Sequence, residues 1–174
     1  LDRGSNFVNN VLYDCEHNGA GSRHIYGVWF QNQVSAASGT CANNTIFDVK
    51  ITGTANARGL YVQLDKASTV CQNNIAMDTS TTSSGNVKDF EYAATTLWTP
   101  DYNLSSDDTS DDGGGTNCLI NKAAADQFVS VSGSIDLHLK TGSDAIDAGT
   151  DLGTSPENME LDTDGRDRDA EGDT

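Results

Sequence analysis

The sequence predicts an all-β protein, a right-handed parallel β-helix of about three coils followed by a C-terminal closing segment. Two apolar segments recur along the chain with one common period of about 30 residues, which is typical of a solenoid whose coils stack on one another. The composition agrees, because the 174 residues include 17 Gly and only 2 Pro, with many Asn, Ser, Thr and Asp residues. Short strands joined by tight turns have this composition.

The first recurring segment carries two adjacent asparagines and, four residues after the second one, an aspartate. It occurs at residues 7–14, 41–48 and 71–78, and the asparagine pairs are 34 and then 30 residues apart. Equivalent residues of neighbouring coils lie above one another, so we expect the side-chain amides of the second asparagines to hydrogen-bond in one column. The members of this structural ladder are Asn10, Asn44 and Asn74.

The second recurring segment is an apolar strand at residues 27–31 and 59–63, with a weaker copy at 89–92. Side chains alternate between the two faces of a strand. One set therefore points inward and stacks from coil to coil, namely Val28/Phe30, Leu60/Val62 and Phe90/Tyr92. The residues between them, Trp29, Tyr61 and Glu91, then point outward along one line.

Two of the four cysteines, Cys41 and Cys71, occupy the same position of the repeat. Their backbones are expected about 4.8 Å apart, which lies within the range of Cα separations of disulfides. They are candidates for a disulfide between neighbouring coils; the alternative is that they are reduced and serve as small core residues. An even number of cysteines in an acidic, Asn-rich chain favours an oxidising compartment, and hence an extracellular or cell-surface location.

A resemblance to a known family rests on motifs in the second half of the chain. These are Asp101-Tyr-Asn-Leu104, Gly142-Ser-Asp-Ala-Ile-Asp-Ala-Gly149 and Asp162-Thr-Asp-Gly165. With the repeats, they resemble the C-terminal part of secreted right-handed parallel β-helix proteins of the pectate-lyase-like superfamily, which commonly read GSPAIDAG where this chain has 142–149. Asp144 stands in place of the usual proline. The resemblance implies architecture more than activity, because this scaffold hosts lyases, hydrolases, tailspikes and adhesins.

The chain is expected to divide into three parts. Residues 1–104 form the parallel β-helix coils, residues 105–118 a polar surface loop, and residues 119–174 the closing segment with its acidic tail. Residues 121–127 are expected to form one short helical turn with Asn121 as its N-cap. Because the chain starts inside a repeat, we expect it to be a portion of a longer protein.

The net charge of −16 argues against nucleic acid and anionic membranes as partners, because both require clustered Lys and Arg. It is compatible with divalent cations, with neutral glycans, or with anionic glycans held through bound calcium. The alternative is that the charge serves solubility alone. No run of about 18 apolar residues is present, so no insertion into a membrane is predicted.

The outward line of aromatic residues is a candidate glycan-binding site. Aromatic faces stack on sugar rings while amides and carboxylates bind the hydroxyl groups. The predicted site consists of Trp29, Tyr61, Gln31, Gln63 and Glu91. The alternative is that residues 119–150 of the closing segment fold back over this face.

The acidic tail is a candidate metal site. Carboxylates alternate around Gly165 in a pattern that suits a hard cation with six to eight oxygen ligands, and calcium is the predicted ion. The ligands would be Asp162, Asp164, Asp167 and Asp169. The alternative is a turn of the family that binds no metal.

No catalytic residue is predicted. Lyases of the superfamily typically use a cation and a Lys or Arg base, but Arg58, Lys66 and Lys88 lie in no recognisable motif. If the protein is an enzyme, the resemblance implies a polysaccharide lyase or glycoside hydrolase. The leading functional hypothesis is a domain that binds or processes polysaccharide. The alternative is a structural or adhesive surface protein, or a fibre subunit that self-associates through its coil ends.

Overall fold

The computed structural model describes residues 5–18, 23–31, 39–63, 69–93, 95 and 97–153. These residues form an all-β structure with several parallel sheets, and the only helix among them is the four-residue α1 (Ala124–Gln127). The strands are β1 (Ser5–Val8), β2 (Val11–His17), β3 (Ile25–Gln31), β4 (Gly39–Ala42), β5 (Thr45–Ile51), β6 (Ala57–Gln63), β7 (Val70–Gln72), β8 (Ile75–Met77), β9 (Ser80–Thr81), β10 (Val87–Ala93), β11 (Leu104–Ser105), β12 (Phe128–Ser130) and β13 (Asp136–Leu139).

Each repeat contributes one strand to each of three parallel sheets. The sheets run β1-β4-β7, β2-β5-β8-β11 and β3-β6-β10, so every strand pairs with its equivalent in the neighbouring repeat. Cys41 pairs with Phe7 on one side and Cys71 on the other, and Leu60 pairs in the same way with Val28 and Phe90. The predicted stacking and its register are therefore confirmed, and the architecture is compatible with a parallel β-helix.

The main hydrophobic core lies between the three sheets. Its fully buried members come mainly from the second and third repeats and are Cys41, Ile46, Val49, Leu60, Val62, Cys71, Ala76 and Phe90. The first repeat contributes half-buried counterparts such as Phe7, Leu12 and Cys15. Burial increases from the first repeat inward because each layer covers the one before it.

The predicted asparagine ladder is present and has a fourth member, Asn103. Asn10 Nδ2 donates to Asn44 Oδ1 at 3.0 Å, Asn44 Nδ2 to Asn74 Oδ1 at 2.9 Å, and Asn74 Nδ2 to Asn103 Oδ1 at 3.0 Å. The backbone N–H of each donor residue also reaches the same oxygen. In the three buried members, Nδ2 bonds in addition to a backbone carbonyl of the preceding repeat. The ladder therefore provides hydrogen-bond partners for side-chain and backbone amides at the turn between β1 and β2 and at the equivalent turns of the next repeats.

The first asparagine of each pair has a different role from the second. Asn9, Asn43 and Asn73 have positive φ angles of 58°, 56° and 57°, and Tyr102 continues the column at 54°. Asparagine is among the few residues that adopt this left-handed conformation readily. One asparagine thus makes the turn, and the next one holds it to the neighbouring repeat.

A second polar column follows the turn that precedes β3, β6 and β10. Asn86 N donates to Asn56 Oδ1 at 3.1 Å, and Asn56 N donates to His24 Nδ1 at 3.3 Å. Nδ1 of His24 thus takes the place that an asparagine oxygen has one repeat later. This column was not predicted from the sequence, because its three members differ in residue type.

The C-terminal end of the stack is closed by residues 97–118. This range includes the predicted polar loop 105–118, whose Ser105, Thr109 and Ser110 are buried. Thr109 Oγ1 accepts from Phe90 N and Asp107 Oδ2 accepts from Asp89 N, both at 2.9 Å. Two backbone N–H groups of β10, those of Asp89 and Phe90, are therefore satisfied by side chains of this segment.

Asp89 occupies a position in the third repeat that is a glycine in the first two repeats. In the first two repeats this position is Gly27 and Gly59, where a Cβ atom would lie 2.7 Å from the carbonyl oxygen of the next repeat. The Asp89 carboxylate instead accepts bonds from Ser106 N and Thr79 N at 2.8 and 3.0 Å. Burial raises the pKa of this carboxyl, and the hydrogen bonds oppose that shift.

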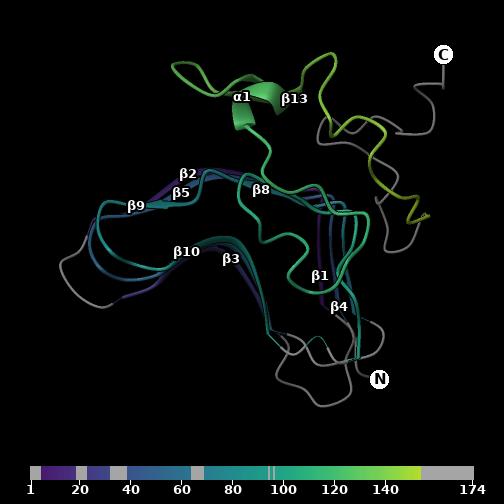
Figure 1. Cartoon of the computed structure of the whole chain (residues 1–174), viewed down its shortest axis with the longest axis horizontal. Coiled ribbons are helices and arrows are strands. Elements are labelled where there is room, and N and C mark those ends of the chain that lie inside the picture. The colour runs from purple at the N-terminus through teal and green to yellow at the C-terminus, as the bar shows by residue number, and fades with distance from the viewer. Residues whose placement is uncertain are drawn as a thin grey trace.

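The closing segment packs on the outer face of the β2-β5-β8 sheet. Phe128 at the start of β12 meets Phe47 edge-on, with ring centroids 6.0 Å apart, in a second hydrophobic cluster with Met77 and Leu104. Strands β12 and β13 pair antiparallel, and α1 and β13 lie beyond β2, β5 and β8, on the side opposite β3 and β10 (Figure 1). The predicted N-cap at Asn121 is wrong, since the helix begins at Ala124 with Ala123 before it. Among the described residues, no helix has the length and apolar character needed to cross a membrane.

Replacing Asn74 by Ala should lower the free energy of unfolding by about 3 kcal/mol, because it leaves buried donors of Asn44 without an acceptor. Asn10→Ala, at the half-buried end of the ladder, should cost only about 1 kcal/mol. Urea denaturation followed by circular dichroism measures both variants. Equal losses would contradict the ladder as a source of stability.

Cys118 follows Asn103 in the ladder column, and burial raises the pKa of its thiol to about 11, partly opposed by the Asn103 N–H. In the native protein at pH 8, alkylation of Cys118 by iodoacetamide should be about a hundredfold slower than that of a peptide cysteine, because less thiolate is present. Mass spectrometry of labelled peptides gives the rate. A native rate equal to the rate in urea would refute the shifted pKa.

Candidate functional site

The described part of the closing segment leaves the outer face of the β3-β6-β10 sheet uncovered. The alternative in which residues 119–150 cover it is wrong, because the described part of the closing segment packs on the other sheet, against Phe47 and Met77. Trp29 consequently keeps 50% of its surface exposed. A large exposed aromatic side chain next to other aromatic rings is a feature of binding surfaces.

Three aromatic rings from two repeats form one cluster on this face. Tyr26 lies 5.1 Å from Trp29 and 5.4 Å from Tyr61 between ring centroids, and Trp29 lies 5.9 Å from Tyr61. Tyr26 and Tyr61 are stacked at an interplanar angle of 26°. The His24 ring extends the row, 6.3 Å from Tyr26. We refer to Tyr26, Trp29 and Tyr61 as the aromatic platform.

An ion pair borders the aromatic platform in the next two repeats. Arg58 is only 5% exposed, and its Nε donates to Glu91 Oε2. Its Nη1 donates to the carbonyl oxygens of Ala57 and Asn86 at 2.8 and 2.7 Å. Burial raises the pKa of the Tyr61 phenol, as does the nearby Glu91 carboxylate, so the phenol is neutral and able to donate at physiological pH.

The structure brings all five residues of the predicted glycan site to this face. Trp29 pairs with Tyr61 and Tyr61 with Glu91, while Gln31 pairs with Gln63 at the end of the same strands. Trp29 and Gln31 are exposed, and the other three are half-buried. Their clustering agrees with the prediction, whereas binding to a glycan remains a prediction.

Tyr26 was not predicted to be a member of the site, and neither were Arg58 and His24. Strict alternation from Val28 and Phe30 puts Tyr26 inside, but the strand bends at Gly27 and turns Tyr26 outward to the other rings. The glycine that recurs before the strand, at 27 and 59, was the available signal. A glycine at one position of successive repeats marks a bend at which side chains change face.

The outward positions of the three strands line up from repeat to repeat. They form three rows, Tyr26/Arg58/Lys88, Trp29/Tyr61/Glu91 and Gln31/Gln63/Ala93. Glycoside hydrolysis usually needs two carboxyl groups on either side of the scissile bond. These rows contain one carboxylate, Glu91, and it is already paired with Arg58.

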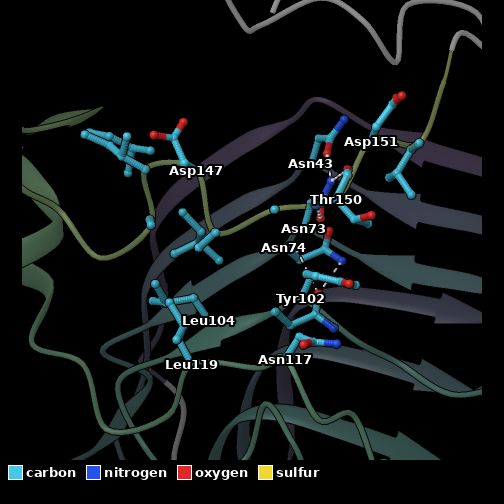
Figure 2. Close-up of a pocket in the computed structure, with 18 of the residues that line it drawn as sticks. Asn43, Asn73, Asn74, Tyr102, Leu104, Asn117, Leu119, Asp147, Thr150 and Asp151 are labelled. Atoms are coloured by element: carbon cyan, nitrogen blue, oxygen red, sulfur yellow. Dashed lines mark hydrogen bonds between the residues drawn. The ribbon is translucent and has the colours of Figure 1, made fainter. Parts of the chain in front are cut away.

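A cavity of about 700 Å³ lies between the turn of the asparagine columns and the closing segment. Figure 2 shows Asn43, Asn73 and Tyr102 in one column with Thr150 and Asp151 beside its upper end, and Asp147 on the other side. Its aliphatic lining comes from Leu104 in the stack, from Leu119, which forms a parallel bridge with Leu104, and from residues such as Leu139 and Ile146 further along the closing segment. The cavity is therefore part of the contact between the closing segment and the repeats.

Asn73 holds the closing segment to the stack beside this cavity. Its Nδ2 donates to Thr150 O at 2.8 Å, and Thr150 N donates to its Oδ1 at 2.9 Å. This pair of bonds imitates the pairing of two backbone strands. A Cβ atom at Gly149 would lie 3.2 Å from Asn73 Oδ1, which explains a glycine at the end of the 142–149 motif.

The predicted metal ligands Asp162, Asp164, Asp167 and Asp169 lie outside the described residues. Within the described residues, no group of three His, Cys, Asp or Glu side chains is placed to hold a metal ion. The aspartates of the repeats do form a column, but Lys50 Nζ lies 2.6 Å from Asp48 and 3.5 Å from Asp14. Lys50 thus already forms ion pairs with both of these carboxylates.

The disulfide candidates Cys41 and Cys71 lie in register on neighbouring strands, both fully buried. Both are free thiols in the structure. The ladder amides Asn44 Nδ2 and Asn74 Nδ2 each lie 3.6 Å from one of the sulfurs. In this state the cysteines act as small core residues, the second of the two possibilities that the sequence left open.

Comparison of the chain with protein-family models, with curated proteins and with solved structures finds no match.

Replacing Asn73 by Ala should raise the exchange rate of the Thr150 amide proton about tenfold, because its acceptor is removed. Hydrogen exchange followed by NMR measures this directly. Asn86→Ala is the matched control, since it removes a side-chain amide from the turn on the far side of the repeat. Unchanged exchange at Thr150 in Asn73→Ala would contradict the assigned contact.

Proposed function

We propose that this chain is an extracellular domain that binds polysaccharide through the outer face of the β3-β6-β10 sheet. The observation that supports the proposal is the aromatic platform, in which exposed Trp29 and half-buried Tyr26 and Tyr61 lie within 6 Å of one another between ring centroids, beside the Arg58–Glu91 pair. The proposal includes a right-handed parallel β-helix of the pectate-lyase-like kind. The parallel sheets, the common period and the asparagine ladder all support that fold.

The proposed binding mode uses the spacing of the stack. Equivalent residues of neighbouring repeats lie about 4.8 Å apart, which is close to the length of one sugar unit in an extended glycan. A chain running along the stack would place successive rings on Trp29 and Tyr61, and its hydroxyl groups would meet Gln31, Gln63 and Glu91. The aromatic faces supply apolar contact, and hydrogen bonds with the amides and the carboxylate fix the orientation of the sugar chain.

The closed end of the stack favours binding over assembly into a fibre. Stacking of one chain on the next requires free strand edges at both ends. Residues 105–110 already satisfy the N–H groups of Asp89 and Phe90 at the edge of β10. We therefore place polysaccharide binding ahead of self-association through coil ends.

Replacing Trp29 by Ala should weaken binding to the polysaccharide at least tenfold, a loss of about 1.4 kcal/mol for one stacked ring. A glycan array identifies the ligand, and titration calorimetry gives the affinity. Tyr13→Ala is the matched control, because Tyr13 is also an exposed aromatic residue of the first repeat but lies in another sheet. Equal affinity of the Trp29→Ala variant and the unmodified protein would remove this face from the proposal.

A further inference from the structure

We infer that Glu91 masks the charge of Arg58 and thereby makes the aromatic platform selective for uncharged sugar chains over chains of uronic acids. This inference rests on the proposed function and names the class of polysaccharide that the same site takes. It makes Glu91 a residue that determines specificity.

Arg58 is a buried cation beside the aromatic platform. It lies in the row between Tyr26 and Lys88, and it influences the Tyr61 phenol. Its side chain is 6% exposed, whereas that of Glu91 is 36% exposed. A ligand on the outer face therefore meets the carboxylate of Glu91 before it meets the guanidinium group.

The other basic groups of the site are also engaged. Lys88 Nζ lies 2.8 Å from Asp112 Oδ2. His24 Nδ1 accepts a hydrogen bond from Asn56 N at 3.3 Å. Both cations in the outward rows thus have carboxylate partners, and the face offers a carboxylated ligand no unpaired positive charge from these rows.

The net charge of the chain acts in the same direction. At −16, it repels a polyanion over distances of about 8 Å at physiological salt. An uncharged chain experiences no such repulsion, while its ring faces still gain the contact with Tyr26, Trp29 and Tyr61. The chemistry of the face therefore suits neutral hexose chains.

Glu91→Gln removes the negative charge of residue 91 and keeps the size and shape of its side chain. Glutamine keeps an oxygen that accepts the Arg58 Nε–H, so the buried guanidinium group retains a partner. The substitution removes the negative charge and leaves that of Arg58 uncompensated. A carboxylate on a ligand near residue 91 is then attracted by the positive charge of Arg58.

The test uses polysaccharides in pairs that differ mainly in charge: methyl-esterified polygalacturonate with polygalacturonate, cellulose oligomers with their C6-oxidised glucuronate forms, and mannan with polymannuronate. In the pair that binds, the unmodified protein should prefer the uncharged chain at least tenfold at low salt. Added salt should raise its affinity for the carboxylated chain by screening the repulsion. This salt dependence needs no variant and remains informative if Glu91→Gln folds poorly.

In Glu91→Gln the preference for the uncharged chain should fall at least tenfold. Asp144→Asn is the matched control, since it removes the same single charge from the closing segment on the opposite side of the sheets, and it should leave the preference unchanged. A preference of the unmodified protein for uronate chains, or equal shifts in both variants, would overturn the inference and leave polysaccharide binding standing. Failure of all six polysaccharides to bind would contradict the proposed function itself, and the inference with it.

Discussion

The side-chain amides of Asn10, Asn44, Asn74 and Asn103 are the constraint on which the rest of this structure depends. Each repeat must turn sharply between two of its strands, and the turn buries polar groups that no strand partner can reach. The amide of one repeat bonds to the backbone and side chain of the next, so the stack can form only in one register. A shift of one residue would move every inward side chain to the surface.

That register determines the chemistry of the surface. Because equivalent residues pair directly, a side chain repeated in the sequence becomes a row in space, and Trp29, Tyr61 and Glu91 form such a row. The same stacking that excludes water from Leu60 and Phe90 leaves the alternate residues on the outside. The aromatic platform and the Arg58–Glu91 pair are thus consequences of the period of the sequence, modified where Gly27 bends the strand.

The sequence was sufficient to predict features that repeat, and insufficient for those that occur once. The ladder, the parallel pairing and the five residues of the candidate site follow from the two recurring segments. Asn103 was not assigned to the ladder because its repeat reads Tyr-Asn instead of Asn-Asn. The Asn73–Thr150 contact spans 77 residues of sequence, and no local pattern indicates which sheet the closing segment covers. Phe128 packs on Phe47, so the closing segment lies on the β2-β5-β8 sheet and does not cover Trp29.

The most direct test of this account is the exchange of the side-chain amide protons of the ladder, measured by NMR on the native protein. The Nδ2 groups of Asn44, Asn74 and Asn103 donate hydrogen bonds to buried acceptors. Their protons should therefore exchange at least a hundredfold more slowly than the Nδ2 protons of the exposed Asn121. Exchange of all four side chains at one common, solvent-limited rate would show that the amides are not bonded along the stack, and the register argument would fail with them.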